Sequence, residues 1–211
     1  MLRKVAYVAV PLFIAFFVLL TSIFKSAAVV YDFSDEAAHF PTDGIVLGDN
    51  DINIEYPLVY PGKILPDHFL WPVKAMRDRA WLFLTTNDSR EAELLLLLAD
   101  KRLASAKVLF DEGKADLGYT VLTKAEKYLE EASQKEMQNR KEGIDTSMCL
   151  ERLARASLKH LQVIKEVSLN APEDAQPQLK SLEKMPHEVY EDTLHALNEK
   201  GMQCPQNPFV K

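Results

Sequence analysis

The pattern of hydrophobic and polar positions first sets apart residues 5–24, which contain no charged residue and are flanked by Arg3, Lys4 and Lys25. At about 1.5 Å per residue, a run of this length makes a helix of about 30 Å, which is the thickness of the hydrocarbon core of a bilayer. Basic residues beside such a helix favour the cytoplasmic side. We therefore expect residues 1–25 to form a short cytoplasmic end and a single transmembrane anchor.

The same segment also has features of a cleavable secretory signal. Ser26, Ala27 and Ala28 place small residues where a signal peptidase could cut. Apolar cores of signal peptides usually have about 7 to 15 residues, and this run is longer. We interpret the chain as a single-pass protein of the cell membrane, with secretion after cleavage near Ala28 as the alternative. In both cases the C-terminal part is extracytoplasmic.

Residues 26–65 are predicted to form an extended acidic linker. Between positions 31 and 62 there are seven Asp or Glu residues, no Lys or Arg, and several Pro and Gly residues. Like charges keep such a chain extended. Polar and apolar residues alternate near its end, which resembles the start of a calcium-binding loop, although the later glycine and glutamate of such a loop are missing. We prefer an extended segment that turns Ile52, Ile54 and Tyr56 toward the following domain.

From Pro66 onward, apolar residues recur at spacings of three and four, and glycine is rare. This periodicity predicts an all-α domain over residues 66–200, followed by a C-terminal tail over residues 201–211. The short connections at Gly113 and Gly143 favour an antiparallel bundle of about five helices, the last of which is broken at Pro186.

The first predicted helix begins after Pro66 and ends near Thr85. We expect five of its side chains to face the core: Val73, Met76, Ala80, Trp81 and Leu84. Four aromatic residues lie close together in this region: Phe69, Trp71, Trp81 and Phe83. We favour core packing for them, because each helix of a bundle must bury a large apolar area. Docking onto the lipid of a nearby membrane is the alternative.

The remaining helices have continuous apolar faces. The second helix is expected to bury Leu95, Leu98, Ala99, Leu103, Ala106, Leu109 and Phe110. The fourth is expected to bury Leu150, Leu153, Ser157, Leu161, Ile164 and Val167. Asn87 or Asp88 is expected to cap the second helix, and the spacing of Asp88 and Glu91 matches a capping box. On the third helix, Lys127, Glu131 and Lys135 have the spacing of ion pairs within one helix.

Small residues at Ala106, Gly118 and Ala125 have some of the spacings of a tetratricopeptide unit. No second unit follows, and a single unit would not be stable as a solenoid. We therefore expect close helix packing at these residues rather than a peptide-binding groove.

Net charge and cysteine content limit the kinds of partner and of covalent link that the sequence allows. The formal net charge is −6, and the three basic residues beside the anchor contribute +3, so residues 26–211 carry −9, which is −6 minus 3. We expect no nucleic-acid partner, because phosphate binding needs a basic surface. Cys149 and Cys204 would lie in a compartment that permits disulfides. They either form a disulfide or remain as one buried helix thiol and one tail thiol.

Part of the chain resembles a known family. The similarity is carried by residues 60–68 (Tyr-Pro-Gly-Lys-Ile-Leu-Pro-Asp-His), Lys74, residues 77–86 (Arg-Asp-Arg-Ala-Trp-Leu-Phe-Leu-Thr-Thr), residues 99–104 and residues 124–129. On these residues the chain is similar to a bacterial domain of unknown function found in exported, membrane-anchored proteins of uncultured small-genome bacteria. The resemblance implies a helical extracytoplasmic fold and no known activity.

Candidate chemistry is sparse. His187, Glu191 and His195 follow one another at spacings of four on one predicted helix face, which makes them weak candidates for a zinc or copper site. The sequence contains no nucleophile elbow, P-loop or dinucleotide fingerprint, so we expect no catalytic residue, no enzyme and no cofactor.

These patterns favour a membrane-tethered, extracytoplasmic helical module. We expect it to have a protein-interaction or structural role in the cell envelope, with an unidentified envelope protein as its partner. An extracytoplasmic metal or stress sensor is the alternative, and an enzyme is the third interpretation.

Overall fold

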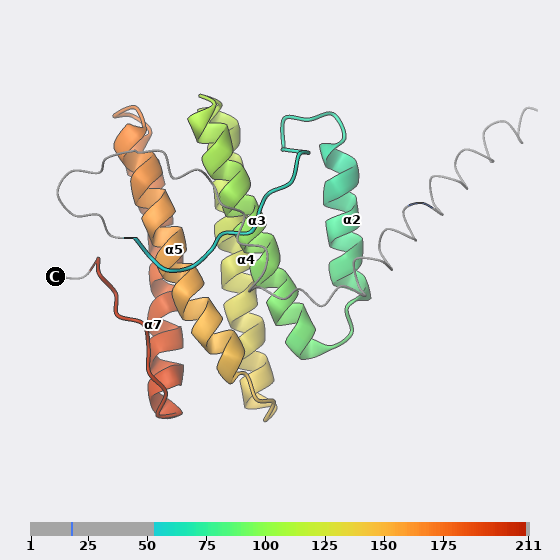
Figure 1. Ribbon diagram of the computed structural model, residues 1–211, viewed down its shortest axis with the longest axis vertical. Coiled ribbons are helices and arrows are strands. Elements are labelled where there is room, and N and C mark those ends of the chain that lie inside the picture. Colours follow the sequence, from blue (N-terminus) through green and yellow to red (C-terminus); the bar gives the residue numbers. More distant parts are fainter. Residues whose placement is uncertain (1–17, 19–52, 210–211) are drawn as a thin grey trace, which may run out of the picture.

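The computed structural model describes residue 18 and residues 53–209, and these residues form an all-α structure (Figure 1). Five helices pack as a bundle, with the seven-residue α6 (Gln176–Leu182) connecting the last two. The five are α2 (Trp71–Leu84), α3 (Asp88–Asp111), α4 (Ala115–Lys141), α5 (Ser147–Asn170) and α7 (Lys184–Glu199). The expected all-α bundle of about five helices is confirmed.

The predicted anchor at residues 5–24, apart from Val18, and the linker up to residue 52 lie outside the described residues. Within the described part, no helix is both long and apolar enough to cross a bilayer.

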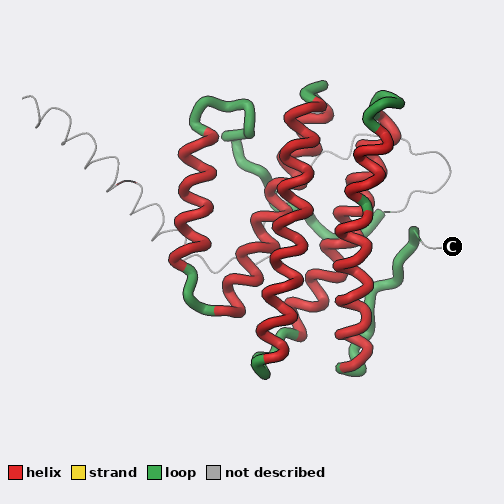
Figure 2. Tube along the Cα trace, turned by 180° about the vertical axis from the view of Figure 1, so that it is seen from behind, coloured by secondary structure: helices red, strands yellow, loops and turns green. Residues whose placement is uncertain are grey.

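A tight hairpin joins α3 and α4, which run antiparallel along their lengths (Figure 2). Gly113 adopts a φ of +77° between them, a conformation that favours glycine. Close packing at Ala106, Gly118 and Ala125 is confirmed. Ala106 and Ala125 are buried, and a Cβ atom at Gly118 would lie only 3.0 Å from the ring of Phe110.

The predicted apolar faces of the second and fourth helices form the core. All their residues are buried except Phe110, which is half-buried. The two largest apolar clusters of the described residues lie at different levels of the bundle. The cluster nearer the α3–α4 turn includes Leu103, Leu122 and Ile164, and the cluster nearer the other end includes Leu96 and Leu153.

Of the two residues expected to cap α3, Asn87 and Asp88, the first does so. Asn87 is the N-cap, and its side-chain oxygen accepts a hydrogen bond from the backbone N–H of Arg90 at 3.1 Å. Asp88 and Glu91 do not act as a capping box. Their carboxylates instead bind the ammonium of Lys135 on α4, at 2.7 and 2.8 Å, and so link the two helices.

The predicted fifth helix is divided three residues before Pro186. The division falls at Glu183, between α6 and α7. Pro186 occupies the first turn of α7, where its missing N–H has no helical partner to lose. The break therefore precedes Pro186, which lies within the first turn of the new helix.

Helix α2 is oriented differently from the prediction. Trp81 is buried, but Val73, Met76 and Leu84 are exposed, and the aromatic residues Phe69 and Phe83 are also exposed. Trp81 packs on Leu94 and Leu97 of α3, and a polar contact joins the same two helices. The buried carboxylate of Asp78 binds the guanidinium of Arg102 at 3.3 Å, and that guanidinium lies 4.2 Å from the centre of the Trp71 ring.

The described end of the linker lies along the bundle, as predicted for Ile54 and Tyr56. Both are half-buried and pack against core clusters. The backbone N–H of Ile54 donates to the side chain of Gln162 on α5 at 3.0 Å. Ile52 lies outside the described residues.

Candidate functional site

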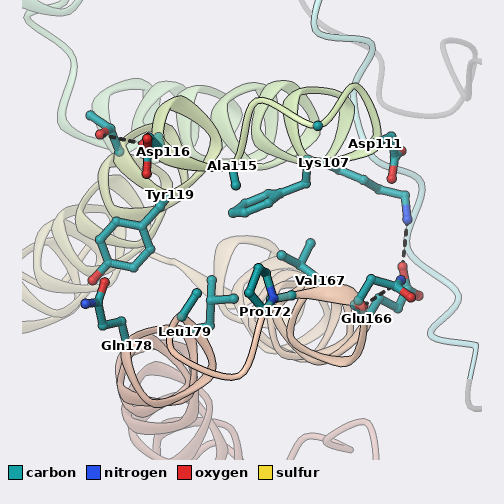
Figure 3. A pocket seen from close by; sticks show the side chains of 16 residues that line it. Lys107, Asp111, Ala115, Asp116, Tyr119, Glu166, Val167, Pro172, Gln178 and Leu179 are labelled. Atoms are coloured by element: carbon teal, nitrogen blue, oxygen red, sulfur yellow. Dashed lines mark hydrogen bonds and ion pairs between the residues drawn. The ribbon is translucent and has the colours of Figure 1, made fainter.

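A pocket of about 560 Å³ opens at the end of the bundle where α3 turns into α4 and α5 turns into α6. This volume falls in the range of small-molecule sites, about 300 to 1,000 Å³. Its middle is apolar and includes Phe110, Val167, Pro172 and Leu179. Figure 3 shows Val167, Pro172 and Leu179 on the side of the pocket opposite Ala115.

The two ends of the pocket differ in chemistry. At one end, Tyr119 of α4 faces Gln178 of α6 (Figure 3). At the other, Lys107 of α3 donates to Glu166 of α5 at 2.7 Å. Glu166 also accepts a hydrogen bond from Gln162 at 2.7 Å.

The charged side chains that line the pocket are unbalanced. They comprise three carboxylates and one ammonium: Asp111, Asp116, Glu166 and Lys107. Because Lys107 neutralises Glu166, the exposed carboxylates of Asp111 and Asp116 leave the rim negative. An aromatic and acidic pocket of this kind is complementary to a cation with an apolar stem.

A second group of polar side chains is buried in the bundle core. His160 on α5 contacts Glu126 on α4 through Nδ1 at 2.8 Å and Asp100 on α3 through Nε2 at 3.4 Å. Tyr56 donates its hydroxyl to Asp100 at 2.6 Å. The side chains of His160, Asp100 and Glu126 are fully buried. We call Tyr56, Asp100, Glu126 and His160 the polar layer, since they lie between the two apolar clusters of the core.

The imidazole of His160 is held in its charged form. Burial lowers the pKa of His160, but the carboxylates of Glu126 and Asp100 outweigh this effect and raise it to about 9. Both ring nitrogens then donate to carboxylate oxygens. Burial and the neighbouring Asp100 also raise the pKa of the Tyr56 hydroxyl, so that it remains a donor.

One atom of the polar layer is unsatisfied. Glu126 Oε2 is buried and accepts no hydrogen bond from the described residues. A buried polar group without a partner is costly, so this layer depends on the charge of His160 for its stability.

The predicted metal candidates belong neither to the pocket nor to the polar layer. His187, Glu191 and His195 are exposed on α7, and His195 contacts Glu199 at 3.3 Å. Among the described residues, no group of three or more His, Cys, Asp or Glu side chains is arranged to hold a metal ion.

The two cysteines are both free thiols, so the disulfide left open by the sequence is not formed. Cys149 is buried against α3 and α4 side chains, whereas Cys204 packs beside Tyr190. Burial, followed by the charges of Glu136 and Glu93, raises the pKa of Cys149 to about 12. This thiol is therefore unreactive in the folded protein.

The sequence patterns predicted neither the pocket nor the polar layer, although the sequence contains a signal for the polar layer. Asp100, Glu126 and His160 each occupy a position of the apolar face of their helix, beside Ala99, Ala125 and Leu161. Ionisable residues at core positions of three successive helices indicate mutual pairing. The pocket had no such signal, because its lining comes from two turns that the sequence does not place side by side.

The fold and these two features define an all-α bundle domain with a charged layer in its core and a pocket at one end. The chain belongs to the DUF5667 family, a domain of unknown function, whose family model matches residues 63–174. The match covers α2 to α5 and more than half of the chain. No curated protein and no solved structure matches the chain.

The family match confirms the resemblance to a domain of unknown function. It begins at Lys63, just after the Tyr-Pro-Gly segment, and continues through α5, beyond the region that carried the resemblance.

Proposed function

We propose that this protein is a non-enzymatic helical module, tethered to the cell membrane by residues 5–24, which binds another protein of the cell envelope outside the cytoplasm. The observation that carries the proposal is the pocket at the end of the bundle. It is open, largely apolar in its middle, and negative at its rim through Asp111 and Asp116.

The chemistry of the pocket favours binding over catalysis. The hydroxyl of Thr120 donates to the backbone carbonyl of Asp116 at 3.0 Å, and Glu166 is bound by Lys107 and Gln162. Catalysis by a nucleophile needs a general base bonded to it, and among the lining residues the Thr120 hydroxyl is bonded to a backbone carbonyl rather than to a carboxylate. The occupant proposed for the pocket is a segment of the partner that presents a Lys or Arg next to apolar side chains.

Photocrosslinking on native membranes tests the proposal. The full chain carries benzoylphenylalanine in place of Gln178, which lines the pocket. The matched control carries it in place of Lys180, an exposed residue on the same short helix that is not part of the lining. A third chain combines the Gln178 label with Ala115→Trp, because Ala115 lines the pocket and a tryptophan there would fill it (Figure 3).

The expected result is one envelope protein crosslinked from position 178, absent from position 180 and lost with Ala115→Trp. The crosslinked peptide of that protein should contain a basic residue beside apolar ones. An adduct that survives Ala115→Trp, or no protein adduct at all, overturns the proposal.

The location is tested separately by adding protease to intact cells. Cleavage within the helical domain is expected if it lies outside the cytoplasm. Full protection of residues 53–209 in intact cells, with cleavage after lysis, would contradict the proposed topology.

A further inference from the structure

Helix α2 and the residues just before it expose an unusual amount of apolar surface. Six of the large apolar side chains that are exposed in the described residues come from this region: Phe69, Leu70, Val73, Met76, Phe83 and Leu84. Phe69 and Phe83 are 82% and 86% exposed. Elsewhere in the described bundle, exposed large apolar residues occur singly, as at Met148 and Leu169. Contiguous exposed apolar surface marks a site of contact with another molecule or a membrane.

The exposed apolar side chains that belong to α2 lie on one face of the helix. Val73, Met76, Ala80 and Phe83 follow one another at spacings of three and four, which places them on the side of α2 that faces away from α3. Asp78 and Trp81 occupy the opposite, buried side. Among the described helices, α2 packs against α3 alone, at the outer edge of the bundle in Figures 1 and 2.

Basic residues border this apolar face. At 100° per residue, Arg77 and Arg79 fall on its two sides; Arg79 is exposed, whereas Arg77 is half-buried and binds the carboxylate of Asp78 at 2.7 Å. Residues 63–84 contain four Lys or Arg and two Asp, a net charge of +2, although the whole chain carries −6. An apolar face with aromatic residues, flanked by basic residues, is typical of helices that lie in the headgroup region of a membrane.

We propose that the outward face of α2 lies on the membrane surface, with Phe69, Met76 and Phe83 inserted among the headgroups of anionic lipids. A second copy of the chain fits this face less well, because a symmetric contact would bring the arginines of two helices together. The face is also convex and one helix wide, whereas a groove for a partner helix is concave.

The membrane is within reach of α2. Forty-six residues lie between residue 24, where the apolar run ends, and Trp71, where α2 begins. This inference shares the membrane anchor with the proposed function but does not depend on the pocket or on its protein partner.

The test uses the full chain in vesicles of phosphatidylcholine with phosphatidylglycerol, labelled with benzoylphenylalanine at Phe83. The control label is at Leu169, which is 66% exposed on α5. Adducts are identified by mass as lipid or protein. We expect about fivefold more lipid adduct at position 83 than at position 169, and a lower yield in vesicles without phosphatidylglycerol.

Two variants separate docking from folding. Met76→Glu places a charge on the outward face and should abolish most of the lipid adduct at position 83. Met148→Glu introduces the same charge at an exposed residue of α5 and should leave the yield unchanged. Arg79→Gln should reduce the difference between anionic and neutral vesicles.

The inference is overturned if the chain floats with the vesicles but the label at position 83 forms no lipid adduct. It is also overturned if that label crosslinks to a second copy of the chain. Chains that do not float at all would contradict the membrane anchor and hence the proposed function, so the two failures are distinguishable. If Met76→Glu leaves the yield of lipid adduct at position 83 unchanged, the inference that this face contacts the membrane is also refuted.

Discussion

Replacing His160 with glutamine should strongly destabilise the bundle. The imidazolium of His160 lies between the carboxylates of Glu126 and Asp100, and all three side chains are fully buried. Glutamine retains a side-chain donor and a similar volume but removes the positive charge. The two carboxylates would then remain buried in the core without a counter-ion, which is the costly consequence of removing one partner from a buried ion pair.

The size of the effect follows from the pKa. Raising the pKa of His160 from 6.5 to about 9 corresponds to about 3 kcal/mol of stability, at about 1.4 kcal/mol for each pH unit. Breaking buried ion pairs typically costs about 3 to 5 kcal/mol. We therefore expect His160→Gln to lower the free energy of unfolding by about 3 to 5 kcal/mol near pH 6.

The same reasoning predicts the sign of the pH dependence. The pKa of His160 is higher in the folded than in the unfolded state, so its contribution is full below pH 6.5 and is lost as pH rises through about 9. Lys74 acts in the opposite direction, because burial lowers its pKa to about 8 in the folded state. The difference between wild type and His160→Gln cancels the effect of Lys74 and isolates that of His160.

Urea unfolding of the full chain in nanodiscs, followed by far-ultraviolet circular dichroism, measures this difference. It should be largest near pH 6 and fall by about 3 kcal/mol towards pH 10. His187→Gln is the matched control, because His187 is exposed on α7, and it should change stability little. A destabilisation by His160→Gln that is the same at both pH values would refute a charged imidazole in the polar layer.

Three further predictions concern the core, a helix cap and a thiol. Leu153→Ala should cost about 2 to 5 kcal/mol, whereas Met148→Ala on the exposed side of α5 should cost almost nothing; equal effects would contradict the packing of α5. Asn87→Ala should cost about 1 kcal/mol in the same urea assay, because it removes the N-cap of α3, and no loss would argue against that cap. Cys149 should react with iodoacetamide only after unfolding, and Cys204 should react sooner because it is less buried; mass spectrometry of the alkylated peptides distinguishes the two.

The sequence was sufficient to choose the inward face of α3 and α5. The residues expected on these faces are buried, apart from the half-buried Phe110, because apolar residues at three- and four-residue spacing turn to one side of a helix. Both helices also bury residues outside the expected faces, such as Leu97 on α3 and Leu158 on α5. The turns were also predictable, since Gly113 and Gly143 adopt positive φ values that glycine readily provides.

Prediction failed for α2 because both of its sides carry apolar residues. The choice between them depends on α3, which presents Arg102 to Asp78 and to the Trp71 ring. A polar contact with a residue that lies 24 positions further along the chain has no periodic signal in α2 itself. The side left outside then exposes Met76 and Phe83, so Phe83, which was expected in the core, is part of the candidate membrane surface.

The polar layer gives a physical reason for the helix register of this bundle. Apolar contacts alone tolerate a shift of one helix along another, because many leucine positions are equivalent. Asp100, Glu126 and His160 come from three different helices, and sliding any one of them by a turn would separate the buried charges. The layer therefore fixes how α3, α4 and α5 align, and with them the turns that form the pocket. If so, His160→Gln should weaken binding at the pocket even though His160 does not line it, whereas a variant of equal destabilisation in the apolar core, such as Leu153→Ala, should not.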